Sequence, residues 1–256
     1  MTITYKDTEV FYTVEGEGKP VVFLHGFLEN HTIFNNIAPD LDGVKAIKVD
    51  LPGHGKTPAL PGDNTMDEMA TIVHKILQAA GENSAYLVGH SMGGYVALAF
   101  AKKFTTQTTG VFLMNSTPYP DTEERKKLRM HGVKVALKNY RPLVSMSVAN
   151  LFSNESRAQF PDEIEQAKQE ALKTPEEGYV ASQKGMMQRE DLVSFWKKAT
   201  FEKAMLLGEK DTLIDAFALK NEFLGENVDV TITDGGHMSY IENLETVNKS
   251  LKKFLI

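Results

Sequence analysis

The sequence predicts an α/β fold, in which helices cover both faces of a mostly parallel β-sheet. Short runs of apolar and β-branched residues alternate along the chain with longer patterns of helical period. Most of these runs are apolar at every position, as expected of strands that are buried on both faces. The alternation is interrupted once, between residues 117 and 199, where helical patterns continue without a strand-like run. This order of segments predicts one sheet that carries a helical insertion.

The first two strands are predicted to form an antiparallel hairpin. Residues 3–5 and 10–14 flank the polar segment Lys6-Asp7-Thr8, which favours a tight turn. The other strand-like runs follow in order and are mostly apolar on both faces. They are residues 21–24, 46–49, 85–88, 111–114, 204–207 and 228–232.

Helices are expected between these runs. Within residues 95–103, the side chains of Val96, Ala99 and Phe100 fall on one helical face. Near the C-terminus a second apolar face is expected from residues at the same spacing, namely Ile241, Leu244, Val247, Leu251 and Phe254.

The helical insertion is predicted to be a cap on the sheet. Met130, Val133 and Leu137 repeat there at helical spacing. Residues 118–200 hold 14 Lys plus Arg and 12 Asp plus Glu, for a net charge of +2, whereas the rest of the chain holds 14 and 22, for −8. We therefore expect a core formed by residues 1–116 and 200–256, with a cap formed by residues 117–199.

Composition excludes several classes of function. The chain has 256 residues and a net charge of −6, so no basic surplus favours nucleic acid or an anionic membrane as a partner. It contains no cysteine, which excludes disulfides, thiolate nucleophiles and cysteine-ligated metals. The longest apolar stretch, residues 95–101, is too short to span a bilayer, and the N-terminus has no apolar signal core. We expect a cytoplasmic protein, and nothing in the sequence indicates its oligomeric state.

The segment Gly89-His90-Ser91-Met92-Gly93-Gly94 is the strongest chemical motif. It follows one predicted strand directly and precedes one predicted helix directly. A nucleophilic serine at such a turn adopts a strained backbone conformation, and glycines at positions 89 and 93 leave room for it. The helix that follows directs its N-terminal amides at negative charge developing beside Ser91. The sequence therefore predicts Ser91 as a nucleophile.

A serine hydroxyl needs a base that takes its proton, and the base needs a carboxylate that orients it. His237, in a glycine-containing loop after the last predicted strand, is the predicted base. Asp211 follows the strand at residues 204–207 and is the predicted orienting carboxylate, with Asp215 as an alternative. The chain order Ser91, Asp211, His237 is the order known for this geometry on a doubly wound sheet.

Backbone N–H groups are expected to bind the oxyanion of the reaction. One donor is predicted at Met92, directly after the nucleophile, and the other at Phe27, in the turn after the strand at residues 21–24. The seven histidines include no pair at helical spacing with a carboxylate partner, so no metal site and no cofactor are expected. Apolar cap residues are expected to form a substrate pocket over Ser91, and those predicted for it are Met186, Met187 and Tyr119.

In their order and spacing, five motifs resemble those of the α/β-hydrolase family over nearly the whole chain. They are the segments at residues 24–27, 50–55, 89–94, 208–211 and 235–237. The resemblance implies an eight-stranded, mostly parallel sheet with a helical cap inserted after the sixth strand. It also implies that Ser91, His237 and Asp211 form the catalytic triad.

The predicted function is hydrolysis of carboxylic esters with small or medium acyl chains, through an acyl-enzyme on Ser91. Two alternatives stay open. One is a lyase or carbon–carbon bond hydrolase of the same fold, although the lyases of the menaquinone pathway typically have arginine where this chain has Tyr95. The other is a ligand receptor that keeps the triad and turns over slowly.

Overall fold

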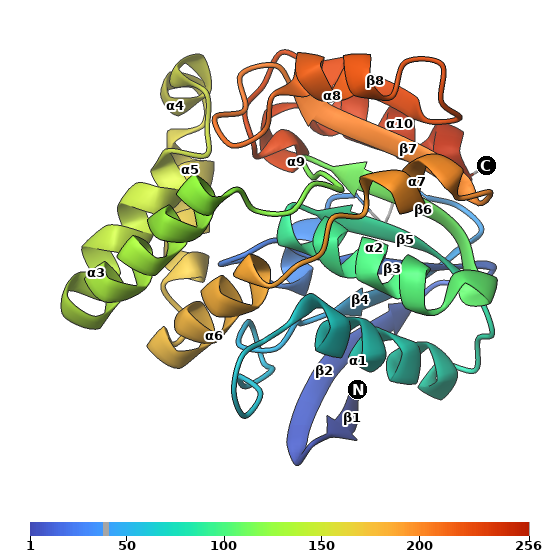
Figure 1. The fold of residues 1–256 in the computed structure, drawn as a ribbon, viewed down its shortest axis with the longest axis horizontal. Coiled ribbons are helices and arrows are strands. Elements are labelled where there is room, and N and C mark those ends of the chain that lie inside the picture. The colour runs from blue at the N-terminus through green and yellow to red at the C-terminus, as the bar shows by residue number, and fades with distance from the viewer. Residues whose placement is uncertain (38–40, 256) are drawn as a thin grey trace.

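The computed structural model describes residues 1–37 and 41–255 (Figure 1). Within these residues, strands form a single eight-stranded sheet in the order β1-β2-β4-β3-β5-β6-β7-β8. The strands are β1 (Thr2–Tyr5), β2 (Thr8–Glu15), β3 (Lys19–Leu24), β4 (Val44–Val49), β5 (Ala85–His90), β6 (Thr108–Met114), β7 (Glu202–Gly208) and β8 (Asp229–Thr233). β2 pairs antiparallel with β1 and with β4, and the other neighbouring pairs are parallel. The predicted fold class and all predicted strands are confirmed.

Each central strand contributes to two hydrophobic clusters, one on each face of the sheet. Val22, Leu87 and Leu113 belong to one cluster, and Phe23, Val88 and Phe112 belong to the other. Successive side chains of a strand point to opposite faces, so continuous apolar runs were needed to fill both clusters. The first cluster includes residues of α1 (Met66–Ala79), α2 (Met92–Lys103) and α8 (Ala216–Glu222). The second includes residues of η1 (His31–Phe34) and α10 (Leu244–Leu255).

The C-terminal helix differs from its prediction. The structure divides the expected helix into α9 (Ser239–Glu242) and α10, because Asn243 has non-helical backbone angles (φ −140°, ψ 40°). The Asn243 side-chain amide donates a hydrogen bond to Asp234 Oδ1 at 2.8 Å. A local side-chain bond of this kind competes with continued helix, which explains the break.

The segment between β6 and β7 is helical throughout its regular structure. Its helices are α3 (Glu123–Ala149), α4 (Asn154–Gln159), α5 (Pro161–Ala171), α6 (Glu176–Met187) and α7 (Val193–Lys198). Figure 1 shows α3, α4, α5 and α6 grouped beside the sheet, at the left of the view. Trp196 of α7 is instead fully buried in the cluster that contains α1 and α2. The division into a core of residues 1–116 and 200–256 and a cap of residues 117–199 stays a prediction.

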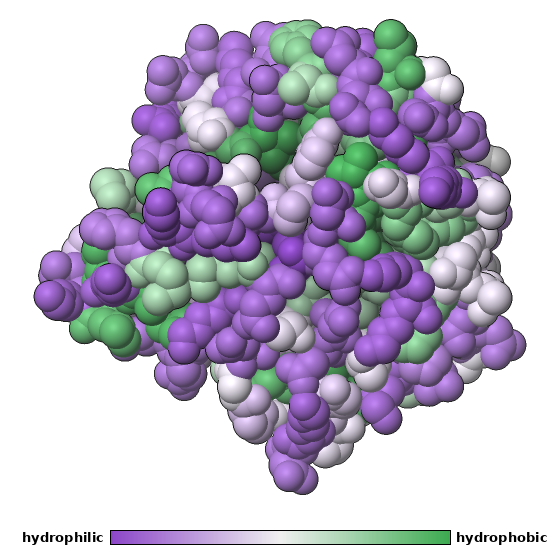
Figure 2. All heavy atoms as spheres, viewed as in Figure 1, coloured by the Kyte–Doolittle hydropathy of each residue, from purple (hydrophilic) through white to green (hydrophobic). Residues whose placement is uncertain are grey.

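α3 packs less completely than its periodicity predicts. Val133 is buried, whereas Met130 and Leu137 are exposed. Figure 2 shows apolar atoms reaching the surface over α3 among hydrophilic ones. Asn139 lies off helical geometry inside α3, three residues before Pro142. Proline has no N–H to donate to the preceding turn, and such a position kinks a helix.

Candidate active site

Ser91 lies at the turn between β5 and α2 with φ +49° and ψ −113°. A positive φ is uncommon for a residue with a Cβ and costs roughly 1–3 kcal/mol. A Cβ on Gly89 would come within 2.5 Å of the Gly93 carbonyl, and a Cβ on Gly93 would collide with the Leu24 carbonyl. The structure therefore requires glycine at both predicted elbow positions. The Ser91 carbonyl accepts from Ser116 Oγ at 2.8 Å, which holds the turn from the β6 side.

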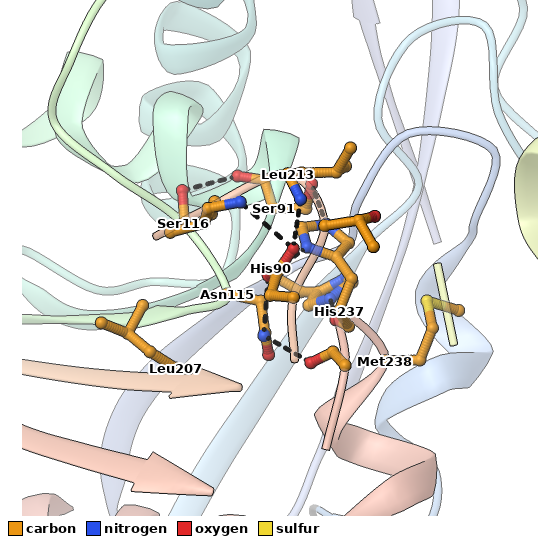
Figure 3. A network of polar contacts seen from close by, with 12 residues as sticks. His90, Ser91, Asn115, Ser116, Leu207, Leu213, His237 and Met238 are labelled. Atoms are coloured by element: carbon orange, nitrogen blue, oxygen red, sulfur yellow. Dashed lines mark hydrogen bonds and ion pairs between the residues drawn. The ribbon is translucent and has the colours of Figure 1, made fainter. Parts of the chain in front are cut away.

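The three side chains predicted as a triad lie in one hydrogen-bonded chain. His237 Nε2 is 2.8 Å from Ser91 Oγ, and His237 Nδ1 is 2.6 Å from Asp211 Oδ2. Figure 3 shows Ser91, His90, His237 and Asn115 gathered at the end of the strands. Asp211 follows β7, and His237 follows β8, so neighbouring parallel strands deliver both to the same edge of the sheet.

Asp211 is held as a carboxylate although it is buried. Burial alone would raise the pKa of Asp211, but the charge and hydrogen bond of His237 hold this pKa below its ordinary value, with help from Leu213 and Asn115. Leu213 N–H donates to Oδ1 at 2.8 Å, and Asn115 Nδ2 donates to Oδ2 at 3.1 Å. An ionised acceptor at Nδ1 fixes the proton there and leaves Nε2 free to accept from Ser91. Sequence reasoning missed Asn115, because a single Asn after a strand gives no distinctive signal.

The alternative carboxylate, Asp215, has a different role. Its side chain accepts from Ala218 N–H at 2.9 Å and caps the N-terminus of α8. No hydrogen bond or ion pair that the described residues make joins Asp215 to His237. The geometry therefore separates the two candidates and favours Asp211.

Of the two predicted oxyanion donors, Met92 directly follows the serine in the sequence, and Phe27 lines the same cavity as the serine. Met92 is the first residue of α2, where a backbone N–H has no partner within the helix. Phe27 lies in the loop after β3 and lines the same cavity as Ser91. Neither N–H donates a hydrogen bond to another described residue. Their role as oxyanion donors stays a proposal.

A buried ion pair that the sequence did not predict connects three loops of the site. His90 Nδ1 is 2.9 Å from Glu29 Oε2, and His90 Nε2 donates to the His237 carbonyl at 3.0 Å. The Glu29 carboxylate also accepts from Gly26 N–H at 2.5 Å and from Tyr240 Oη at 3.2 Å. Because Glu29 accepts from every partner, it is ionised, and His90 then needs protons on both nitrogens.

The electrostatics of this pair agree with its hydrogen bonds. Burial would raise the pKa of Glu29, but the charge and hydrogen bond of His90 keep this pKa below its ordinary value. Burial would lower the pKa of His90, but Glu29 and the His237 carbonyl keep it above its ordinary value. The feature of the sequence that could have indicated a role for Glu29 is its position, three residues after Gly26 in the loop that carries Phe27.

Two further buried histidines near the site are neutral. His25 Nδ1 donates to the Gly26 carbonyl at 2.7 Å, and its Nε2 accepts from Leu51 N–H at 2.9 Å, which leaves no second proton. His54 Nδ1 donates to the Pro52 carbonyl at 3.1 Å. Burial lowers the pKa of His25 and lowers the pKa of His54 to about 3. His25 thus holds the loop after β3.

A cavity of about 450 Å³ opens over Ser91, and we call it the serine cavity. Its lining comes from the loop after β3, from the end of β5, and from α3 and α6. Met186 lines it, as predicted. Met187 does not, because the next residue of a helix points about 100° away. Tyr119 lines a neighbouring cavity instead, since the chain between β6 and α3 carries it past the opening.

The helical insertion contacts the histidine loop directly. The Leu151 carbonyl accepts from His237 N–H at 2.8 Å. Glu242 accepts from Ser153 N–H at 3.0 Å and from Gly236 N–H at 2.7 Å. The position of His237 therefore depends on the insertion as well as on the sheet.

The described residues contain no group of three or more His, Asp or Glu side chains that could hold a metal ion. In the same part of the chain, no helix combines the length and the apolar character that crossing a bilayer requires.

Residues 19–244 match the family of the alpha/beta hydrolase fold. The chain is 28% identical to a dihydrolipoyllysine-residue acetyltransferase component of an acetoin cleaving system from Cupriavidus necator, over 96% of this chain and 66% of that protein. It is 23% identical to a putative 2-succinyl-6-hydroxy-2,4-cyclohexadiene-1-carboxylate synthase from Haemophilus influenzae, over 92% of this chain and 97% of that protein.

Among solved structures, a malate-bound thermophilic esterase from Thermogutta terrifontis superposes with a TM-score of 0.91. It shares 26% sequence identity, and the match covers 97% of this chain and 93% of the esterase.

The buried pair of Glu29 and His90 predicts a large loss of stability when one partner is removed. Glu29→Ala leaves a buried imidazolium without its carboxylate, which costs about 3–5 kcal/mol. Urea unfolding should therefore report a free energy lower by that amount. Glu9→Ala, which removes a carboxylate from an exposed position, should change it by less than about 0.5 kcal/mol. Equal effects of the two substitutions would contradict the buried pair.

His54 predicts a pH dependence of stability. Below pH 6.5, the ordinary pKa of histidine, the unfolded chain binds a proton at His54. The folded chain binds this proton only near pH 3, because burial lowers the pKa of His54 to about 3. The free energy of unfolding therefore falls as pH drops through this window. In His54→Gln this fall should be shallower by up to about 1.4 kcal/mol per pH unit, measured by urea unfolding at several pH values. His131→Gln, at an exposed position, is the control for loss of a histidine, and a curve for His54→Gln parallel to that of the wild type would disprove the assignment.

Proposed function

The chain belongs to the α/β-hydrolase fold family, and from this we propose that it is a serine hydrolase that cleaves carboxylic esters of small or medium acyl chains. The observation that carries the proposal is the hydrogen-bonded chain from Ser91 through His237 to Asp211, at a strained turn that opens into the serine cavity. The esterase among its structural relatives supports hydrolase activity.

Attack on the ester begins at Ser91. As Ser91 Oγ forms a bond to the carbonyl carbon, His237 Nε2 accepts the hydroxyl proton across the 2.8 Å contact. The imidazolium that forms is stabilised by the Asp211 carboxylate at Nδ1. The negative charge that develops on the carbonyl oxygen is bound by the N–H groups of Phe27 and Met92.

Collapse of the tetrahedral intermediate breaks the bond to the alcohol. His237 donates its proton to the leaving oxygen, and the acyl group stays on Ser91 as an ester. Water then attacks this acyl-enzyme, with His237 again as the base, and releases the acid and free Ser91. The Glu29–His90 pair does not touch the reacting atoms, and it positions the His237 backbone and the loop that carries Phe27.

A lyase or carbon–carbon bond hydrolase is the second candidate, because the similarity to the synthase from Haemophilus influenzae extends over most of both chains. Keto acids and diketones tested beside esters distinguish the two. A receptor with slow turnover is distinguished by burst titration with a fluorophosphonate, in which stoichiometric labelling without multiple turnovers would favour the receptor.

Removing the nucleophile should abolish catalysis without affecting the fold. Ser91→Ala is expected to lower kcat for p-nitrophenyl acetate by at least about 10³-fold and to prevent labelling by a fluorophosphonate. Ser194→Ala changes an exposed serine of α7 and should leave both unchanged. Circular dichroism checks that Ser91→Ala is folded, and activity retained by this folded variant would disprove the proposal.

The two aspartates after β7 should respond differently to the same substitution. Asp211→Asn removes the charge that orients His237 and is expected to lower kcat by about 10⁴-fold, as the analogous change does in serine proteases. Asp215→Asn keeps a side chain that caps α8 and should leave kcat within about twofold. Steady-state ester hydrolysis measures both, and a larger effect at position 215 would reverse the assignment.

A further inference from the structure

Arg125 lies where the serine cavity meets a second cavity. This second cavity, which we call the outer cavity, has a volume of about 450 Å³ and is lined by Asp121, Asp215 and Glu222 among others. Arg125 and Tyr95 line both cavities. The Thr122 side chain accepts from Arg125 N–H and caps α3, which fixes Arg125 in the first turn of this helix.

Three of the carboxylates around the two cavities are paired with cationic side chains, and the fourth, Asp215, accepts from a backbone N–H. Glu29 pairs with His90, and Glu222 pairs with Lys197 at 2.5 Å. Asp215 caps α8. Asp121 accepts from Arg129 Nε at 2.5 Å and lies 2.6 Å from Arg189 Nη1. Among the described residues, none of the ion pairs around these cavities includes Arg125.

Positive charge is therefore in excess beside the serine cavity. Asp121 is a single carboxylate shared by Arg129 and Arg189, and Arg125 adds a third guanidinium nearby. Burial and the charge of Arg129 hold the pKa of Arg125 below its ordinary value, although a guanidinium stays protonated in proteins. The charge of Asp121 also acts on Arg125, but Asp121 is shared with two other guanidinium groups. A partly buried charge that is compensated only in part is costly, and an anion bound from solution would reduce that cost.

We propose that Arg125 binds a carboxylate of the substrate, so that the preferred substrates are esters with an anionic group remote from the bond that is cleaved. This rests on the proposed ester hydrolysis at Ser91. The planar guanidinium matches a carboxylate through two parallel hydrogen bonds. Ser91 and Arg125 line the same cavity, so one small substrate can contact both.

The test compares two esters that differ in the terminal group alone. Mono-p-nitrophenyl adipate carries a carboxylate at the end of its acyl chain, and p-nitrophenyl hexanoate ends in a methyl group. We expect kcat/KM to be higher for the adipate ester in the wild type. Arg125→Gln should lower the ratio of the two kcat/KM values roughly tenfold to a hundredfold, as expected for the loss of a charged hydrogen-bonded pair.

Arg141→Gln is the matched control, because it removes the same charge from an exposed position of the same helix. It should leave the ratio at its wild-type value. If Arg125→Gln does not fold, the wild-type ratio decides alone. A wild-type ratio near one, or a folded Arg125→Gln with the wild-type ratio, overturns the carboxylate site and leaves the serine hydrolase intact.

Calorimetric titration with free adipate separates the two proposals, because it requires no turnover. Binding to the wild type and to Arg141→Gln that is lost in Arg125→Gln supports the site even if neither ester is hydrolysed, an outcome that would defeat the proposed function. Absence of adipate binding to the wild type overturns the site.

Discussion

The turn between β5 and α2 holds Ser91 at a positive φ, and three strands meet around it. Ser91 N–H donates to the Met114 carbonyl of β6 at 2.9 Å, while Gly93 packs against the Leu24 carbonyl of β3. Any side chain at position 93 would push β3 away from α2. Because the Phe27 loop begins where β3 ends, the same close contact sets the distance between the serine and the Phe27 N–H.

Asp211 and His237 are supplied by parallel strands, and the buried Glu29–His90 ion pair fixes the loops of the site relative to one another. Asp211 and His237 come from the ends of β7 and β8, so their separation follows from strand spacing. The loops after β3 and β8 have no such ladder between them, and the Glu29–His90 pair connects them through Gly26 N–H and the His237 carbonyl. The pair therefore holds these two loops together, as backbone hydrogen bonds hold neighbouring strands together.

The helical segment after β6 lines part of the serine cavity and carries a surplus of basic residues. Through Leu151 and Ser153 it holds the His237 loop, and through α3 it places Arg125 at the edge of the serine cavity. Of the basic residues in this part of the sequence, Arg129 and Arg189 share the Asp121 carboxylate, and Arg125 lies near them. This location is the basis for expecting an anionic substrate.

The sequence alone determined the order of strands and helices along the chain and the serine and histidine of the hydrogen-bonded chain. Apolar runs and a glycine-flanked serine are local signals, so Ser91 and His237 could be predicted without coordinates, whereas Asp215 remained an alternative to Asp211. Only the tertiary structure separated Asp211 from Asp215, placed Met187 and Tyr119 outside the serine cavity, and divided the last helix at Asn243. It alone brought together Glu29 and His90, which lie 61 residues apart. Such contacts depend on which loops the fold brings side by side, and no local pattern in the chain encodes that.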